Sequence, residues 1–168
     1  MGHFSIQPGE RGEAVLSPSA RQFIVAEAKL GSALSARTKN APDFDQAARN
    51  VACMAHMIHV AHADLKAIER LGFYVIAPET QIGAKVFGTF VTRESIRRKV
   101  VARVEQYEGF WGKWVEDVLD PVLERIQLSL LSWEEVLSAL PTNEDATAIR
   151  AFYAHCLTCN PTRGEQSR

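Results

Sequence analysis

The sequence lacks the features that mark several large classes of protein. It has three cysteines among 168 residues, and nowhere do 18 apolar residues follow one another. An odd, small number of cysteines excludes a disulfide-stapled extracellular scaffold, and the short apolar runs predict no membrane span. The 19 basic and 20 acidic residues leave a net charge of −1. This near-neutral balance excludes a nucleic-acid coat or a polybasic membrane binder.

The chain also lacks the short motifs of common enzyme classes. It contains no Gly-x-Gly-x-x-Gly loop, no P-loop, no Gly-x-Ser-x-Gly elbow and no His-Glu-x-x-His pair. No catalytic residue follows from the sequence, so we expect a non-enzymatic function more than an enzymatic one. The N-terminus shows no signal-peptide pattern, and we therefore expect a cytoplasmic location.

The composition that remains is typical of a folded globular protein. Hydrophobic residues make up 46% of the chain and charged residues 23%. The length corresponds to about one domain. We expect a flexible N-terminal arm at 1–16, a helical domain at 17–159 and a flexible tail at 160–168.

Apolar residues recur at helical spacing after Ser17-Pro18, a pair typical of a helix start. At 100° per residue they share an arc of about 160°, which predicts a helix of about five turns ending near Asn40. Glu27 falls inside this arc and interrupts its apolar face. The stripe consists of Ala20, Phe23, Ile24, Ala28, Leu30 and Leu34.

A second helix is predicted over 42–71, with Gly72 as its left-handed stop. Between Val51 and Ala63 its residues are apolar, Cys or His on every side, which is typical of a helix buried by several neighbours. We therefore place it at the centre of the fold. Residues 73–91 are rich in aromatic and β-branched residues and in glycine and proline, which favours a short hairpin or an ordered loop.

The remaining residues predict further helices. Thr92 caps a third helix whose apolar stripe falls within an arc of about 80° and runs to Val118. An apolar face continues from Asp120-Pro121 to Leu130. Ser132 and Glu135 form a capping box for a short helix, and Thr142 starts the last one. These patterns predict an all-α fold, a single-domain helical bundle of five or six helices with a short irregular or hairpin insert at 73–91.

All three cysteines and four of the five histidines gather in two segments, one on the second helix and one at the end of the last. Cysteine and neutral histidine are the preferred ligands of zinc. Packing in the core is the alternative for buried thiols and imidazoles. We expect no cofactor or, if these residues bind a metal, zinc or iron. The candidate ligands are Cys53, His56, His59, His62, His155, Cys156 and Cys159.

The start of the third helix is basic, and its apolar stripe is rich in aromatic residues. Tyr, Trp and Arg are typical of interface hot spots. The cations surround the helix instead of lining one face, which disfavours reading of a nucleic-acid groove. The candidate interaction residues are Arg93, Arg97, Arg98, Lys99, Arg103, Tyr107, Trp111 and Trp114.

The leading hypothesis is a small cytoplasmic protein-interaction module, an adaptor, regulator or subunit that acts through a helical surface. A protein partner or self-association is expected, and no membrane. The first alternative is a metal-binding helical bundle, a sensor or an enzyme that uses the histidine and cysteine clusters. The second is a nucleic-acid-associated regulator that uses the basic segment at 93–103.

Overall fold

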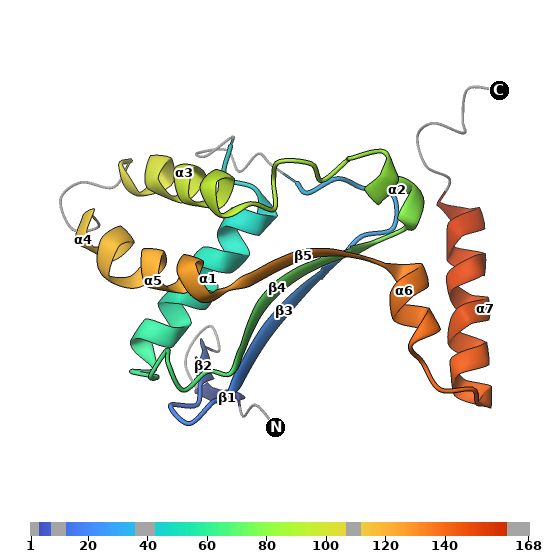
Figure 1. Ribbon diagram of the computed structural model, residues 1–168, viewed down its shortest axis with the longest axis horizontal. Coiled ribbons are helices and arrows are strands. Elements are labelled where there is room, and N and C mark those ends of the chain that lie inside the picture. The colour runs from blue at the N-terminus through green and yellow to red at the C-terminus, as the bar shows by residue number, and fades with distance from the viewer. Residues whose placement is uncertain (1–3, 8–12, 36–42, 107–111, 161–168) are drawn as a thin grey trace.

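A parallel β-sheet of three strands organises the chain. The computed structural model describes residues 4–7, 13–35, 43–106 and 112–160. Strands β3 (Gln22–Ala28), β4 (Arg70–Ala77) and β5 (Gln127–Ser132) lie side by side in that order, and both pairs are parallel. Val25 is opposite Phe73, which in turn is opposite Leu128. Figure 1 shows the three strands as one twisted ribbon across the molecule.

A separate antiparallel hairpin precedes the sheet. It consists of β1 (Phe4–Gln7) and β2 (Glu13–Leu16), in the segment predicted as an N-terminal arm. Leu16 at its end is fully buried in the main core.

Helices make the connections between the strands and the end of the chain. Helix α1 (Gln46–Val60) joins β3 to β4. A run of short helices joins β4 to β5, and two helices follow β5. The run consists of α2 (Glu79–Gly83), α3 (Arg93–Val104), α4 (Gly112–Trp114), a π-helix (Val115–Leu119) and α5 (Asp120–Arg125). The last two are α6 (Trp133–Ser138) and α7 (Glu144–Cys159). Across all the residues described above, no helix is long and apolar enough to cross a membrane.

The order of the strands puts the large helices on one face of the sheet. Crossover connections between parallel strands are almost always right-handed, and both crossovers step across the sheet in the same direction. Helices α1, α3 and α5 therefore lie on the same side (Figure 1). The core forms between α1 and this face, where Phe73, Val75 and Met54 are at most 1% exposed.

The prediction of an all-α helical bundle is wrong, because the protein has a mixed α/β fold with a parallel sheet. The clearest correction concerns the predicted helix from Ser17 to Asn40, where β3 lies instead. Phe23 is buried and its neighbours Gln22 and Ile24 are exposed, the period of two that a strand requires. Phe23 and Ile24, which share one arc on a helix, point to opposite faces of the sheet.

The second helix is correct in position but too long in the prediction. Helix α1 ends at Val60, and β4 occupies the stretch from Arg70, where helix was predicted, into the predicted insert. Gly72 is not a helix stop but a buried strand residue, and a Cβ there would lie 2.6 Å from the ring of Tyr74. The absent side chain thus makes room for the tyrosine.

The long third helix is also divided. Helix α3 ends at Val104, and the chain resumes as α4, the π-helix and α5 before β5 begins at Gln127, where helix was predicted. Local end signals fared better. Thr92 caps α3 by accepting from the Ser95 amide, and the capping box of α6 is confirmed.

The start of α1 is fixed by a buried ion pair. Asp45 is its N-cap, accepts from the amide of Ala48 and pairs with the ammonium group of Lys99 on α3. The side chains of Asp45 and Lys99 are 1% and 7% exposed. The ring of Phe90 lies 4.5 Å from the same ammonium. This pair joins α1 to α3 in the interior of the protein, where both side chains are shielded from water.

We expect Asp45→Ala to lower the free energy of unfolding by about 3–5 kcal/mol, because it leaves the Lys99 ammonium buried without its carboxylate. Urea unfolding followed by circular dichroism measures this change. The exposed Asp43 is the control, and Asp43→Ala should change stability by less than about 0.5 kcal/mol. A double variant, Asp45→Ala with Lys99→Met, should recover part of the loss. A loss as large as in the single variant would contradict the ion-pair explanation.

Candidate functional site

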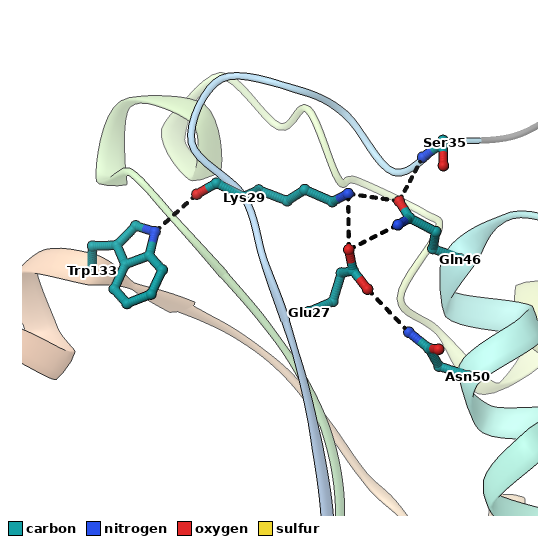
Figure 2. Close-up of polar contacts among 6 residues, drawn as sticks. All are labelled: Glu27, Lys29, Ser35, Gln46, Asn50 and Trp133. Carbon is teal, nitrogen blue, oxygen red and sulfur yellow. Dashed lines mark hydrogen bonds and ion pairs between the residues drawn. The ribbon is translucent and has the colours of Figure 1, made fainter. Parts of the chain in front are cut away.

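Four polar side chains meet at the carboxyl end of β3, between the sheet and α1. Figure 2 shows Glu27, Lys29, Gln46 and Asn50 turned toward one another. The ammonium of Lys29 lies 2.9 Å from Glu27 Oε1 and 2.6 Å from Gln46 Oε1. Gln46 Nε2 donates to Glu27 Oε1 at 2.8 Å, and Asn50 Nδ2 donates to Glu27 Oε2 at 3.2 Å. We call these four residues the Glu27 cluster.

The periods of the two elements bring these residues together. Glu27 follows Phe23 and Val25 on the face of β3 that α1 covers, and Lys29 continues the alternation just past the strand. Gln46 and Asn50 are four residues apart, so they share one side of α1. The strand supplies the charges and the helix supplies the amides.

The cluster is an enclosed place for two charges. The side chain of Lys29 is 8% exposed and that of Glu27 is 21% exposed. Buried charges are found where they are paired and hydrogen-bonded, and both conditions are met here. Such an arrangement is typical of functional sites as well as of structural ion pairs.

A loop closes over the cluster from the carboxyl end of the sheet. The Ser35 amide donates to Gln46 Oε1 at 2.9 Å, and the Gly31 amide donates to Gln81 Oε1 on α2 at 3.0 Å. Gly31 has a φ of +133°, a backbone conformation that other residues rarely adopt. Ligands of open α/β sheets bind just beyond the carboxyl ends of the strands, which is where this loop and the cluster lie.

Lys29 is also held at its backbone. Its amide donates to Ile76 O, and its carbonyl accepts from the indole of Trp133 at 2.8 Å (Figure 2). Trp133 is the first residue of α6, whose start the capping box of Ser132 and Glu135 fixes. The position of the Lys29 backbone therefore depends on the next element of the fold.

The chemistry of the cluster is that of hard oxygen ligands beside a cation. Carboxylate and amide oxygens suit Mg²⁺ and Mn²⁺, and Mg²⁺ is commonly bound by one or two carboxylates together with substrate phosphates. A lysine ammonium is a frequent phosphate ligand. Glu27 Oε1 and Gln46 Oε1 both face Lys29, so a metal ion there would share its ligands with the ammonium.

The histidine and cysteine residues of the sequence analysis lie elsewhere. Cys53, His56 and His59 are exposed on α1, and His62 is exposed in the turn that follows, with a φ of +49°. Their partners in the predicted joint site belong to α7, which lies at the opposite end of the molecule from α1 (Figure 1). The structure therefore does not bring the two segments together.

Smaller groupings of these residues do occur. His155 Nε2 lies 3.6 Å from Cys159 Sγ on exposed turns of α7, beside the half-buried Cys156. His59 and His62 line a cavity of about 380 Å³ with Asp117. Over the ranges that the structure describes, no group of three or more His, Cys, Asp or Glu side chains could hold a metal ion.

The basic segment is largely engaged within the fold. Arg93 donates to the carbonyls of Leu123 and Ile126, and Lys99 pairs with Asp45. The remaining cations of the segment divide into paired and exposed ones. Asp120 binds Arg97 through two hydrogen bonds and raises its pKa, Arg103 donates to Gln106, and Arg98 is exposed.

The predicted aromatic stripe can be followed at one of its three positions. Trp114 is half-buried and packs against the core, as an inward-facing residue would. Tyr107 and Trp111 lie outside the described residues.

Sequence reasoning missed the Glu27 cluster. The signal was present, because Glu27 interrupts the apolar face of the predicted helix whereas Glu27 and Lys29 fit a strand that alternates. Gln46 and Asn50 carried no signal, since polar residues at a helix start are common.

Comparisons with known proteins do not identify the chain. No protein-family model, no curated protein and no solved structure matches it. The geometry of the cluster is therefore the basis for a function.

We expect Gln46→Ala to loosen the cluster. The change removes the acceptor of the exposed Ser35 N–H and one of the two partners of the buried Lys29 ammonium, and a lost hydrogen bond of this kind costs about 0.5–1.5 kcal/mol. Amide hydrogen exchange followed by NMR should show faster exchange at Ser35. Gln22→Ala, at an exposed position of the same strand as Glu27, is the control and should leave that rate unchanged. Unchanged exchange in Gln46→Ala would show that the amide does not hold the loop.

The capping box of α6 predicts a pH dependence. The backbone N–H of Ser132, and then its hydroxyl, donate to Glu135 and hold its pKa below the ordinary 4.5. This contribution to stability is fully present above pH 4.5 and is lost as the pH falls through the lowered pKa. An NMR titration of the Glu135 carboxyl should show the low pKa, and Ser132→Ala should raise it. Equal values in the two proteins would contradict the box.

Proposed function

We propose that the Glu27 cluster is an active site that hydrolyses phosphodiester bonds with the aid of a divalent metal ion. The observation that carries the proposal is the enclosed pair of Glu27 and Lys29 at the carboxyl end of a parallel strand, where the side-chain amide of Gln46 binds both members. A carboxylate and an ammonium side by side match the two needs of this chemistry, a metal ligand and a phosphate ligand.

Each residue has a role that follows from its contacts. Glu27 and the side-chain oxygen of Gln46 would hold the metal ion, which would stabilise negative charge on the phosphate group of the substrate. Lys29 holds a second phosphate oxygen and stabilises the charge that grows there in the transition state. Asn50 positions Glu27 through its hydrogen bond to Oε2. Water adds to phosphorus, the ester P–O bond breaks, and a proton from the water ends on the departing alcohol.

The surroundings of the cluster favour a nucleic acid as the substrate. Asp45, which directly precedes Gln46, pairs with Lys99, so the basic helix α3 is anchored beside the cluster. Arg98, next to Lys99, is exposed and available to a phosphate backbone. Within the basic segment this proposal gives Arg98 a part in substrate binding, because the other cations of the segment are engaged within the fold.

Cleavage of plasmid DNA, single-stranded DNA and RNA with millimolar Mg²⁺ or Mn²⁺ tests the proposal. We expect cleavage by the natural protein and a fall of about 10²–10³-fold in rate for Glu27→Gln and for Lys29→Met. Calorimetry with Mn²⁺ separates the two roles. Glu27→Gln should lose metal binding, whereas Lys29→Met should keep it.

Glu69→Gln is the matched control. Glu69 forms a surface ion pair with Arg21 and is 61% exposed, so the variant should cleave and bind Mn²⁺ as the natural protein does. Natural protein that neither binds Mn²⁺ nor cleaves any of the three substrates would overturn the proposal. Cleavage that persists in Glu27→Gln would place the active site elsewhere.

A second candidate function is a protein-interaction module that acts through the sheet, instead of through the helical surface that the sequence analysis favoured. One observation supports it: the face of the sheet opposite α1 exposes apolar side chains, with Ile24 48% exposed. This candidate does not compete with the first, because the two use opposite faces of the sheet.

A further inference from the structure

Among the residues that the structure describes, no large helix covers one face of the parallel sheet. Strand alternation turns residues of β3, β4 and β5 away from α1, and nearly all of those in the middle of the strands are apolar. Parallel sheets are found almost only with both faces covered. We call this surface the open sheet face. It consists of Ile24, Ala26, Ala28, Tyr74, Ile76 and Leu131.

Helix α7 has an exposed apolar side that could cover such a face. Arg150 donates to Leu137 O and Leu140 O, and Tyr153 donates to Glu134, so one side of α7 is held against α6. Burial and the neighbouring Glu134 carboxylate raise the pKa of Tyr153. On another side, Ile149 is 49% and Phe152 68% exposed. An apolar helix side is thus left without cover.

The uncovered side of α7 adjoins the open sheet face. A groove of about 240 Å³ is lined by Ala28 from the sheet, by Trp133 and Leu137 from α6, and by Ile149 and Phe152 from α7. Figure 1 shows α7 standing beyond the end of the sheet instead of lying across it. The open sheet face and the apolar side of α7 therefore border the same groove and diverge from it.

The size of α7 matches the face that lacks a helix. Its 16 residues make a rod of about 24 Å, and the eight residues of β4 extend over about 26 Å. Charge agrees as well. Glu144 and Asp145 begin α7, and the exposed Arg70 begins β4. A helix laid along the strands in the same direction would bring these opposite charges together.

We propose that the open sheet face is covered by α7 of a second copy of this chain. The contact is reciprocal, because each copy carries one open sheet face and one uncovered helix side. A two-fold axis then satisfies both at once, and each copy both gives and receives a helix. A contiguous apolar patch on the surface is typical of an interaction site. This proposal is independent of the chemistry at the Glu27 cluster.

The molar mass in solution, measured by light scattering and by analytical ultracentrifugation, tests the proposal. We expect twice the mass of one chain. Phe152→Glu and Ile24→Glu alter the two halves of the contact separately, and each should raise the dimer dissociation constant by at least about 30-fold. Val60→Glu is the control. It alters a side chain that is 45% exposed at the end of α1, so it should leave the dimer intact.

Cross-linking identifies which surfaces meet. In a background with serine at positions 53, 156 and 159, one chain carries Ile24→Cys and another carries Phe152→Cys. After mixing and mild oxidation we expect a disulfide-linked dimer of the two different chains. A chain with both changes should link to its partner, not to itself.

Three results would overturn the proposal. The first is a monomer at about 100 μM, a concentration at which the interfaces of stable dimers are occupied. The second is a dimer that withstands both Phe152→Glu and Ile24→Glu. The third is a cross-link formed within one chain, which would show that α7 folds back onto its own sheet. Because both substituted side chains are exposed in one chain, each variant should keep the circular dichroism spectrum of the natural fold and unfold cooperatively. The midpoint of thermal unfolding should fall only as far as the loss of the dimer requires.

Discussion

The direction of the two crossovers is the constraint from which the rest of the structure follows. Three parallel strands in sequential order require two connections that step the same way, and right-handedness places both on one face. That face receives α1, α3 and α5 and becomes the core. The same rule leaves the other face to be covered by something outside the crossovers. A deep core and an exposed apolar face are thus two results of one topology.

Within this frame the Glu27 cluster lies at a junction. Residues on the inner face of β3 are buried by α1, and the strand continues this pattern as far as Glu27 and Lys29. At that point α1 presents Gln46 and Asn50 to the strand instead of apolar residues. Two charged residues therefore occupy buried positions where leucine or valine would pack without needing an ion pair or a hydrogen bond. Replacing a buried ion pair by apolar residues is often neutral or stabilising, so stability alone does not account for these residues.

Two local cap signals in the sequence were reliable, whereas the helix start at Ser17-Pro18, the helix stop at Gly72 and the patterns that depend on the period were not. The caps at Thr92 and Ser132 involve side chains and amides only a few residues apart, so the sequence predicts them correctly. Phe23, Ile24 and Ala28 fit a helical arc, yet the segment also fits a strand, and only pairing with β4 decides between them. The Glu27 cluster joins residues 19 positions apart on different elements. No local pattern predicts a contact between these two elements, although the position of Glu27 within an apolar stripe indicated that the helix prediction was doubtful.

Lys29 is gripped at two points that belong to different parts of the protein. Its ammonium is bound by the cluster under α1, and its carbonyl is bound by the first residue of α6. Tyr153 and Arg150 of α7 are in turn hydrogen-bonded to α6, so α7 is connected to the Lys29 backbone through α6. Lys29 is therefore the residue through which hydrogen bonds connect the Glu27 cluster to α6 and α7. A displacement of α6 and α7 relative to the sheet would therefore act on the backbone of Lys29 through Trp133.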